Sequence, residues 1–321
     1  MTHPVLPACA ALALSLSAAS ASASCGSAYC TLMTDRYAQG TGEPHVGWSA
    51  DLRLEYVRQK RLRSGTHDID AGEVTDEEAI ERETKNLNLL ATLGYGFDQH
   101  WSVLLRVPAV RRDHSHDLLD EETGEPSTEE RWRFTRLGDA QLLARYQATI
   151  GEGATSLAAF GGLKLPTGSI HVANDDDVRA ERALQPGTGT NDLVVGLAGR
   201  HVLGATDAAI GQIAVTQALD SREHFHPGRR IELAAGWSHA FSARLGSVVQ
   251  LNYRHRERDS GAEAEPENSG ATTVELSPGL TLGTGSMSTL YAYVQLPLYQ
   301  DVNGIQLVPR NSFALGWTAD F

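Results

Sequence analysis

The strongest constraint on the fold is a change between apolar and polar side chains at every second residue, repeated along most of the chain. In the segment 48–56, Trp48, Leu52 and Tyr56 fall on one face, and Asp51 and Glu55 fall on the other. Successive side chains of a β-strand point to opposite sides, so this period predicts a strand with one apolar face. The same pattern predicts twelve strands, over residues 48–56, 87–97, 101–110, 137–146, 157–165, 193–201, 209–219, 231–241, 245–253, 272–282, 290–298 and 313–321.

The connections between these segments alternate strictly between long and short. The long connections are expected over 59–86, 111–136, 166–192, 220–230, 254–271 and 299–310. The short ones between them are 98–100, 147–156, 202–208, 242–244 and 283–285. An antiparallel meander with its long loops at one end produces this alternation, whereas a sandwich with Greek-key crossovers does not. Closure removes the sheet edges, which a bilayer demands because unpaired backbone groups in hydrocarbon cost several kcal/mol each. We therefore expect an all-β fold over residues 47–321, a closed antiparallel up-and-down transmembrane β-barrel of about 12 strands.

The composition is compatible with a barrel and excludes two other classes. Hydrophobic residues make up 41% of the 321 residues, and beyond the first twenty-odd residues no run of 18 apolar residues can form a spanning helix. The net charge of −13 argues against nucleic acid as a partner, because phosphate binding needs clustered Lys and Arg. The stretches 59–84, 113–136 and 167–192 hold almost all of this charge, and Arg179 and Arg182 in the last of them are expected to be exposed.

The N-terminus has the features of an export signal. Residues 5–17 are apolar and lead to Ala21-Ser22-Ala23, so we expect a signal peptide over 1–23, although no Lys or Arg precedes the apolar stretch and a retained apolar helix is the alternative. Residues 24–46 then form a periplasmic N-terminal segment that contains Cys25 and Cys30. In an oxidising compartment these two cysteines are expected to form a disulfide, with a metal or redox site as the alternative.

The aromatic residues and the C-terminus agree with a membrane barrel. Residues 313–321 carry an apolar stripe that ends in Phe321, and this resembles the C-terminal signature that bacterial outer-membrane barrels present to their assembly machinery. The aromatic residues near the short-turn strand ends are expected to form a girdle at the membrane interface, with ordinary core aromatics as the alternative. They are Trp48, Tyr95, Phe97, Trp101, Trp237, Phe241, Trp317 and Phe321.

Assigning the apolar faces to lipid sends the polar faces into the lumen. The residues expected to line it are Asp51, Arg53, Glu55, Asn88, Arg106, Asp139, Gln141, Arg145, Lys164, Arg230, Glu232, Gln250, Arg254 and Glu275. Cations and anions nearly balance in this set, so the lining can hold water and screen passing solutes with weak ion selectivity. The same residues can instead pair with one another and plug the barrel, and the sequence leaves both alternatives open.

Other candidate chemistry is sparse. His114 with His116, and His224 with His226, have the spacing that places two rings on one side of a strand, compatible with zinc or copper, or they are simply polar. Ser238 and His239 are adjacent and point to opposite faces, so we expect no catalytic site and no cofactor.

Short motifs carry a resemblance to a known family. The runs LKLPTG at 163–168, LQPGTG at 184–189 and YVQLPLY at 293–299, followed by Asn303-Gly304, are similar to landmarks of the outer-membrane barrel family named after the meta-pathway of phenol degradation. The resemblance covers most of residues 47–321 and is strongest after residue 160. It implies a channel or transporter in a Gram-negative outer membrane that passes small polar or amphipathic solutes, hydrophobic or aromatic ones included. Its partners would be outer-membrane lipid, the assembly machinery and the solute, with both termini periplasmic.

Two other functions stay open at this point. One is a structural or adhesive sealed barrel. The other is a metal-linked outer-membrane protein that uses the His and Asp residues of the loops together with the Cys pair.

Overall fold

The computed structural model describes residues 32, 34, 45–74, 79–120, 123, 126–151, 153–285 and 287–321. The expected signal peptide and the Cys25–Cys30 disulfide lie outside these residues. Two short 3-10 turns, η1 (Ala71–Glu73) and η2 (Arg182–Leu184), interrupt the strands. Within the described ranges, no helix is long and apolar enough to cross a membrane.

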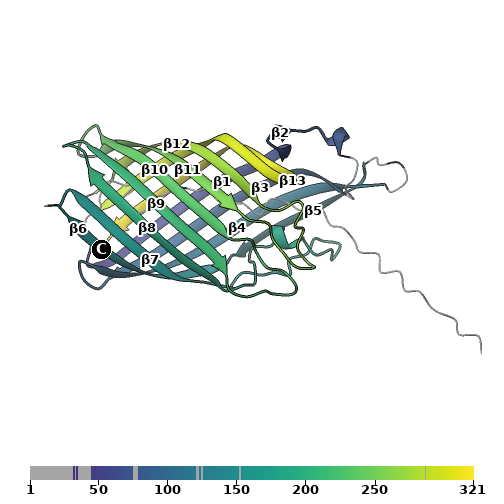
Figure 1. Ribbon diagram of the computed structural model, residues 1–321, viewed down its shortest axis with the longest axis horizontal. Coiled ribbons are helices and arrows are strands. Elements are labelled where there is room, and N and C mark those ends of the chain that lie inside the picture. The colour runs from purple at the N-terminus through teal and green to yellow at the C-terminus, as the bar shows by residue number, and fades with distance from the viewer. Residues whose placement is uncertain are drawn as a thin grey trace, which may run out of the picture.

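The strands form one closed antiparallel sheet in which neighbours along the chain are neighbours in space, so the up-and-down arrangement is confirmed (Figure 1). The first strand, β1, also pairs with the last, β13, and this pairing closes the barrel. The strands of the wall are β1 (Gly47–Gly65), β3 (Ala79–Gly96), β4 (Trp101–Leu119), β6 (Ala140–Ile150), β7 (Thr155–Leu165), β8 (Asp192–Val202), β9 (Asp207–Ala218), β10 (Arg230–Ala240), β11 (Leu245–Arg256), β12 (Ala271–Gly283) and β13 (Ser288–Asp320).

The wall has an even number of crossings because β13 reverses direction. Its first part pairs antiparallel with β12 up to Val302, and its second part pairs antiparallel with β1 from Val302 to Asp320. Eleven straight strands of alternating direction cannot close with antiparallel neighbours throughout, so β13 crosses the wall twice. The reversal lies beside Gly304, whose φ of 58° falls in the left-handed region and whose Cβ position would overlap the Asn268 side chain. The prediction of a loop over 299–310 is therefore wrong, because these residues belong to β13 and turn tightly beside Gly304.

One side of the barrel is taller than the other. β1, β3 and β4 are 18 or 19 residues long, whereas β6–β12 have 11 to 13. β4 pairs with β6 near the short-turn end and with β5 (Pro126–Leu137) farther out, and β2 (His67–Asp68) pairs with the outer end of β1. We call the outer parts of β1, β3, β4 and β5 the tall wall. The prediction of loops over 59–86 and 111–136 is therefore wrong for those residues of the two ranges that form strands of the tall wall.

The outer face of the barrel is an apolar belt. On β1, Trp48, Leu52, Leu54 and Tyr56 are each at least 39% exposed, while the intervening Glu55 is fully buried. The outward-facing residues of β1 from Trp48 to Tyr56 span about 20 Å along the barrel axis at a rise of 3.3 Å per residue and a tilt near 40°. This height is close to that of the apolar band of a membrane barrel.

The residues of the expected aromatic girdle lie at or near the strand ends beside the short turns. The C-terminus lies at this same end of the barrel (Figure 1). Trp48 packs edge-on against Tyr95 at 4.9 Å between ring centroids, and Trp101 contacts Tyr146 at 5.0 Å. Phe97 and Phe321 are more than half exposed. Amphipathic rings favour this depth at a membrane interface, so the belt and the girdle together define where a bilayer would sit.

Candidate functional site in the barrel lumen

Charged residues meet in the middle of the lumen. Arg53 on β1 lies 2.9 Å from the carboxylate of Glu55, and Glu232 on β10 lies 3.3 Å from Arg230 and 3.6 Å from Arg254. Strand pairing explains the second cluster, because Glu232 stands directly opposite Arg254 in the β10–β11 register. Buried charges need such partners, since an unpaired one costs several kcal/mol.

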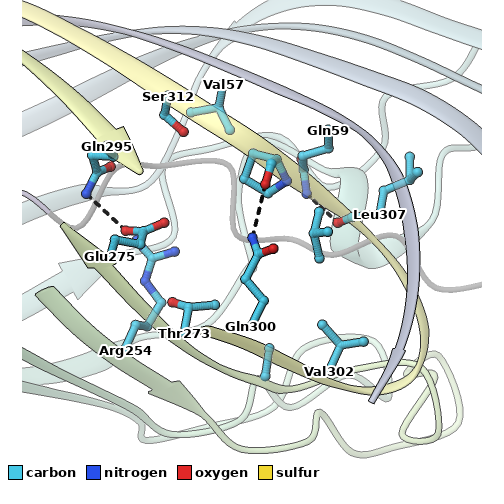
Figure 2. Close-up of a pocket in the computed structure, with 13 residues that line it drawn as sticks. Val57, Gln59, Arg254, Thr273, Glu275, Gln295, Gln300, Val302, Leu307 and Ser312 are labelled. Carbon is cyan, nitrogen blue, oxygen red and sulfur yellow. Dashed lines mark hydrogen bonds between the residues drawn. The ribbon is translucent and has the colours of Figure 1, made fainter. Parts of the chain in front are cut away.

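Neutral polar groups continue this network toward the closing seam. On β13, Gln295 donates to Glu275 at 3.0 Å, and the Tyr291 hydroxyl donates to Asp51 at 2.8 Å. Figure 2 shows Gln295 turned toward Glu275, and nearer the outer end Gln59 turned toward the Leu307 carbonyl. The polar groups that the barrel hides from lipid are thus hydrogen-bonded to one another, as buried polar groups require.

Among the residues that the structure describes, three cavities can be followed along the lumen. The first, about 50 Å³, opens near the short turns beside His100. It shares Leu104 and Arg145 with the second, about 110 Å³, which is lined by Arg106, Arg230 and Glu232 among others. The third, about 30 Å³, includes Arg254 and is drawn in Figure 2. A water molecule occupies about 30 Å³ of liquid, so these spaces suit a few water molecules or a small solute.

Two residues that precede the barrel lie inside it. Leu32 is buried in the lumen, in a cluster with Ile210, Val248 and Tyr291, and Thr34 accepts a hydrogen bond from Arg53 at 2.8 Å. Arg53 also donates to the Leu32 carbonyl at 3.1 Å. These contacts narrow the lumen at the level of the charged cluster.

A buried ionic lock joins β7, β8 and the outer loop between them. The Lys164 ammonium lies 2.8 Å from Asp139 and 3.1 Å from Asp192, and all three side chains are less than 10% exposed. Lys164 also donates to the Thr190 carbonyl at 3.0 Å and to the Thr188 hydroxyl. Asp139 occupies the break between β5 and β6, so the lock fixes the loop 166–191 to the wall at that break.

The ionic lock explains why glycine occupies positions 168 and 187 in the motifs LKLPTG and LQPGTG, since a side chain at either position would clash. A Cβ atom on Gly168 would lie 2.8 Å from the Gly187 Cα, and one on Gly187 would lie 2.6 Å from an Asp139 oxygen. The Gly168 and Thr188 amides both donate to Asp139, at 3.0 and 2.9 Å. LKLPTG and LQPGTG thus meet in space as two halves of one anchor.

The outer loops form a continuous rim across the mouth. The loop 166–191 packs on the inner face of the tall wall, where Trp132 donates to the Val178 carbonyl at 2.9 Å and Arg112 to the Leu184 carbonyl. On its other side, Arg182 stacks over the Phe225 ring at 4.9 Å. Arg182 is 6% exposed, so its expected exposure is wrong, whereas the Arg179 side chain is 37% exposed.

The rim continues from the β9–β10 loop to the closing seam. His226 and Ser260 exchange backbone hydrogen bonds at 2.8 and 2.9 Å, and Asn303 donates to the Ser269 carbonyl at 2.9 Å. The outer mouth is therefore bridged by loops that hold each other in place.

The histidine pairs are not assembled into metal sites in the part of the chain that the structure describes, where no group of three or more His, Cys, Asp or Glu residues can hold a metal ion. His114 hydrogen-bonds Thr84 at 2.8 Å, and His116 lies 3.1 Å from Glu130, both on the inner face of the tall wall. His224 is exposed with a positive φ of 58°, and His226 contacts the Asp220 carbonyl at 3.0 Å. Burial lowers the pKa of His114 to about 3.

The residues predicted to line the lumen fall into three groups, and their part in solute passage stays a prediction. Those of the charged and polar network described above are Asp51, Arg53, Glu55, Arg230, Glu232, Arg254 and Glu275. Those on the inner wall beside it are Asn88, Arg106, Gln141, Arg145 and Gln250, with Asn88 and Gln250 fully buried and Arg106 3.4 Å from Gln141. Asp139 and Lys164 belong to the lock.

Sequence reasoning missed three members of these sites. Asp192 completes the lock, and Leu32 and Thr34 enter the lumen. Asp192 follows directly on the glycine-rich run 187–191, which is the signal that could have found it. Nothing in the short apolar and polar pattern around Leu32 predicts where it packs.

Comparison with known proteins supports the architecture. No family model matches the sequence, and no curated protein matches it significantly. The chain is similar to the COG4313 outer membrane channel from Pseudomonas putida F1, at 13% identity and a TM-score of 0.64 over 90% of this chain and 100% of that one. At this identity the likeness shows the fold alone, and that fold is one that an outer-membrane channel has.

Weaker structural matches include a Pseudomonas aeruginosa FadL homologue, at 10% identity and a TM-score of 0.46 over 90% of this chain and 98% of that one. The CymD monoaromatic hydrocarbon channel matches at 8% identity and a TM-score of 0.46, over 92% of this chain and 94% of that one.

Proposed function

We propose that the protein is an outer-membrane channel for small polar or amphipathic solutes. The observation that carries this proposal is the series of cavities along the lumen, in which Arg145 borders the first two and the Glu232–Arg254 pair separates the last two. Polar side chains that already pair with one another can exchange those partners for a passing solute at little net cost. Membership of the family named after the meta-pathway of phenol degradation is part of this proposal, supported by the motifs at 163–168 and 184–189.

The charges around the middle cavity predict a mild preference for anions. Among the described residues that line it, the charged ones are Arg106, Arg145, Arg230 and Glu232. Across the whole lumen cations and anions nearly balance, so the preference is small. Low-dielectric walls strengthen each charge, so these residues control passage more than loop charges do.

Planar-bilayer recordings of purified protein test the proposal. Wild type should conduct, and the double variant Arg106→Glu with Arg145→Glu changes the lumen by four charge units, so its reversal potential should move toward cations. The matched control is Arg229→Glu with Arg258→Glu, two exposed outer residues whose charges salt screens beyond about 8–10 Å. Absence of conductance, together with no uptake of small sugars or amino acids into proteoliposomes, would refute the channel.

We also propose that the barrel lies in the outer membrane with its short turns and both termini on the periplasmic side. It is supported by the aromatic girdle at the short-turn end and by the long loops at the other. A single cysteine placed at exposed Ser242 should be labelled by a membrane-impermeant maleimide only after the outer membrane is opened. Labelling of this cysteine in intact cells would show that the short turns face outward and would contradict the proposed orientation. No cofactor or catalytic residue is part of this function.

A sealed barrel is the second candidate, and a specific observation favours it. Leu32 and Thr34 fill the lumen beside Arg53, and the loops bridge the mouth. Absence of conductance in the wild-type protein would support the sealed form, and a gain of conductance after removal of residues 24–44 would show that the segment with Leu32 and Thr34 closes the lumen.

A further inference from the structure

The outward face of the tall wall changes abruptly from apolar to basic. On each strand the outward-facing residues can be followed from the belt toward the outer end. The last apolar ones are Tyr56 on β1, Leu87 on β3, Ala109 on β4 and Leu137 on β5. The first charged ones beyond them are Arg58, Lys85, Arg111 and Arg133. All four are bases, in a chain whose net charge is −13.

Strand pairing brings these bases into one patch, which we call the outer basic patch. Arg58 pairs in register with Lys85, Lys85 with Asp113, and Asp113 with Arg133. Arg111 lies one outward-facing position closer to the belt on β4, opposite Leu87. Arg82 and Arg131 extend the patch outward, and the side chains of these two are 42% and 48% exposed.

The acids that pair with these bases are fewer than the bases and are less exposed. Asp117 pairs with Arg82 and is 15% exposed. Glu83 is shared between Arg58, at 2.5 Å, and Lys85, at 2.7 Å. Asp113 is shared between Arg131, at 2.7 Å, and Arg133, at 3.1 Å. The Asp113 side chain is 23% exposed and that of Arg133 is 61% exposed. Glu83 and Asp113 each hold two bases, and the side chains of those four bases are 40–61% exposed, which leaves a surplus of positive charge at the surface.

The height of the patch matches the head groups of a membrane. The first bases stand two or four residues beyond the last apolar side chain of their strand. At 3.3 Å per residue and a tilt near 40°, two residues correspond to about 5 Å along the axis. Phosphate groups lie at this depth, and arginine presents a planar fork of donors that matches phosphate in a bidentate way.

From this charge complementarity we propose that the outer basic patch binds the phosphate groups of an anionic glycolipid in the surrounding outer leaflet. The lipid lies against the tall wall with its acyl chains along the apolar belt and its phosphates between Arg58, Lys85, Arg111 and Arg133. Binding is confined to this side of the barrel, because the shorter strands β7–β12 carry no comparable extension. The proposal rests on the same membrane seating as the proposed function, but not on solute passage.

Lipid titration of the purified full chain in a zwitterionic detergent tests this site. The probe is diphosphorylated lipid A, and the readouts are lipid bound per protein by native mass spectrometry and the temperature of the heat-induced gel-mobility shift. The variant Arg58→Gln, Lys85→Gln, Arg133→Gln should bind lipid A at least tenfold more weakly than wild type. The control variant Arg229→Gln, Arg258→Gln removes two exposed bases on the other side of the mouth and should bind like wild type.

Three comparisons separate the outcomes. Phosphatidylcholine and sodium phosphate should neither stabilise the wild type nor compete with lipid A, and 1 M salt should weaken binding because the Debye length falls to about 3 Å. Equal loss in both variants, equal binding of phosphatidylcholine, or competition by inorganic phosphate would each overturn the assignment. A protein that binds lipid A at this patch but conducts no solute refutes the channel and keeps the lipid site.

Discussion

Removing the Lys164 ammonium should release the outer loop 166–191 from the barrel. In Lys164→Met, Asp139 and Asp192 keep their hydrogen bonds from Thr188 and Thr190 but lose the cation that lies 2.8 and 3.1 Å away. Both carboxylates are less than 10% exposed. Breaking a buried ion pair by removing one partner costs about 3–5 kcal/mol, because the remaining charge stays desolvated.

Without the ammonium, the desolvated carboxylates of Asp139 and Asp192 repel each other. Lifting of the loop would lower this electrostatic energy, because water could then reach both carboxylates. We therefore expect faster hydrogen–deuterium exchange over residues 166–191, a lower temperature for the heat-induced gel-mobility shift, and larger, noisier conductance in bilayers. The barrel strands themselves should exchange as in wild type, since their backbone ladder does not pass through Lys164.

Two further variants make this reasoning refutable. Lys60→Met removes an exposed lysine of β1 and should change nothing. Adding Asp192→Asn to Lys164→Met removes one of the two unpaired charges and should recover part of the lost stability. If Lys164→Met and Lys60→Met exchange at the same rate, or if Asp192→Asn worsens the variant, the lock does not hold the loop electrostatically.

Two other predictions follow from buried contacts. Leu32→Ala should free the segment inside the lumen, because truncating a buried leucine costs about 2–5 kcal/mol; single-channel recordings should then show higher conductance, and unchanged conductance would contradict this. Burial of His114 holds its pKa at about 3 against 6.5 unfolded, so the unfolded state binds more protons between these values. The tall wall should keep its full stability above pH 6.5 and lose about 2 kcal/mol by pH 5. In His114→Gln that pH dependence of proteolysis in the tall wall should disappear, while in His171→Gln, an exposed control, it should persist.

The sequence was informative wherever one strand face was apolar. The sequence predicts strands such as β8 and β10 within one residue of their observed bounds, because lipid on one side and a polar lumen on the other make the two strand faces clearly different. The tall wall was missed for the same reason. There Arg58 and Lys85 face outward while Gln59 and Asn86 face inward, so both faces are polar and the period loses its contrast. Charged outward residues mark the end of the apolar belt, so the alternation predicts loops where the strands continue.

The candidate site was predictable only one residue at a time. Inward positions follow from strand parity, so residues such as Arg53, Glu232 and Arg254 could be placed inside the barrel without knowing their partners. The lock needs Asp139, Lys164 and Asp192 to meet, and their proximity depends on the break between β5 and β6 and on a loop that returns to the wall. No local pattern encodes that return, although the glycines at 168 and 187 mark the points where the backbone comes close.

The seam between β1 and β13 has a consequence for how the protein folds. Ser49 pairs with Asp320, so the last ladder to form joins the two ends of the barrel sequence. The entropy of closing so long a chain is modest, since each doubling of length adds only about 0.6 kcal/mol, but pairings of such high contact order form slowly. Until the seam closes, β1 and β13 are both open edges that can pair with another chain. A stalled assembly should therefore accumulate as an open sheet with two unpaired edges. A segment that pairs with either edge would stop the barrel just before the β1–β13 pairing forms.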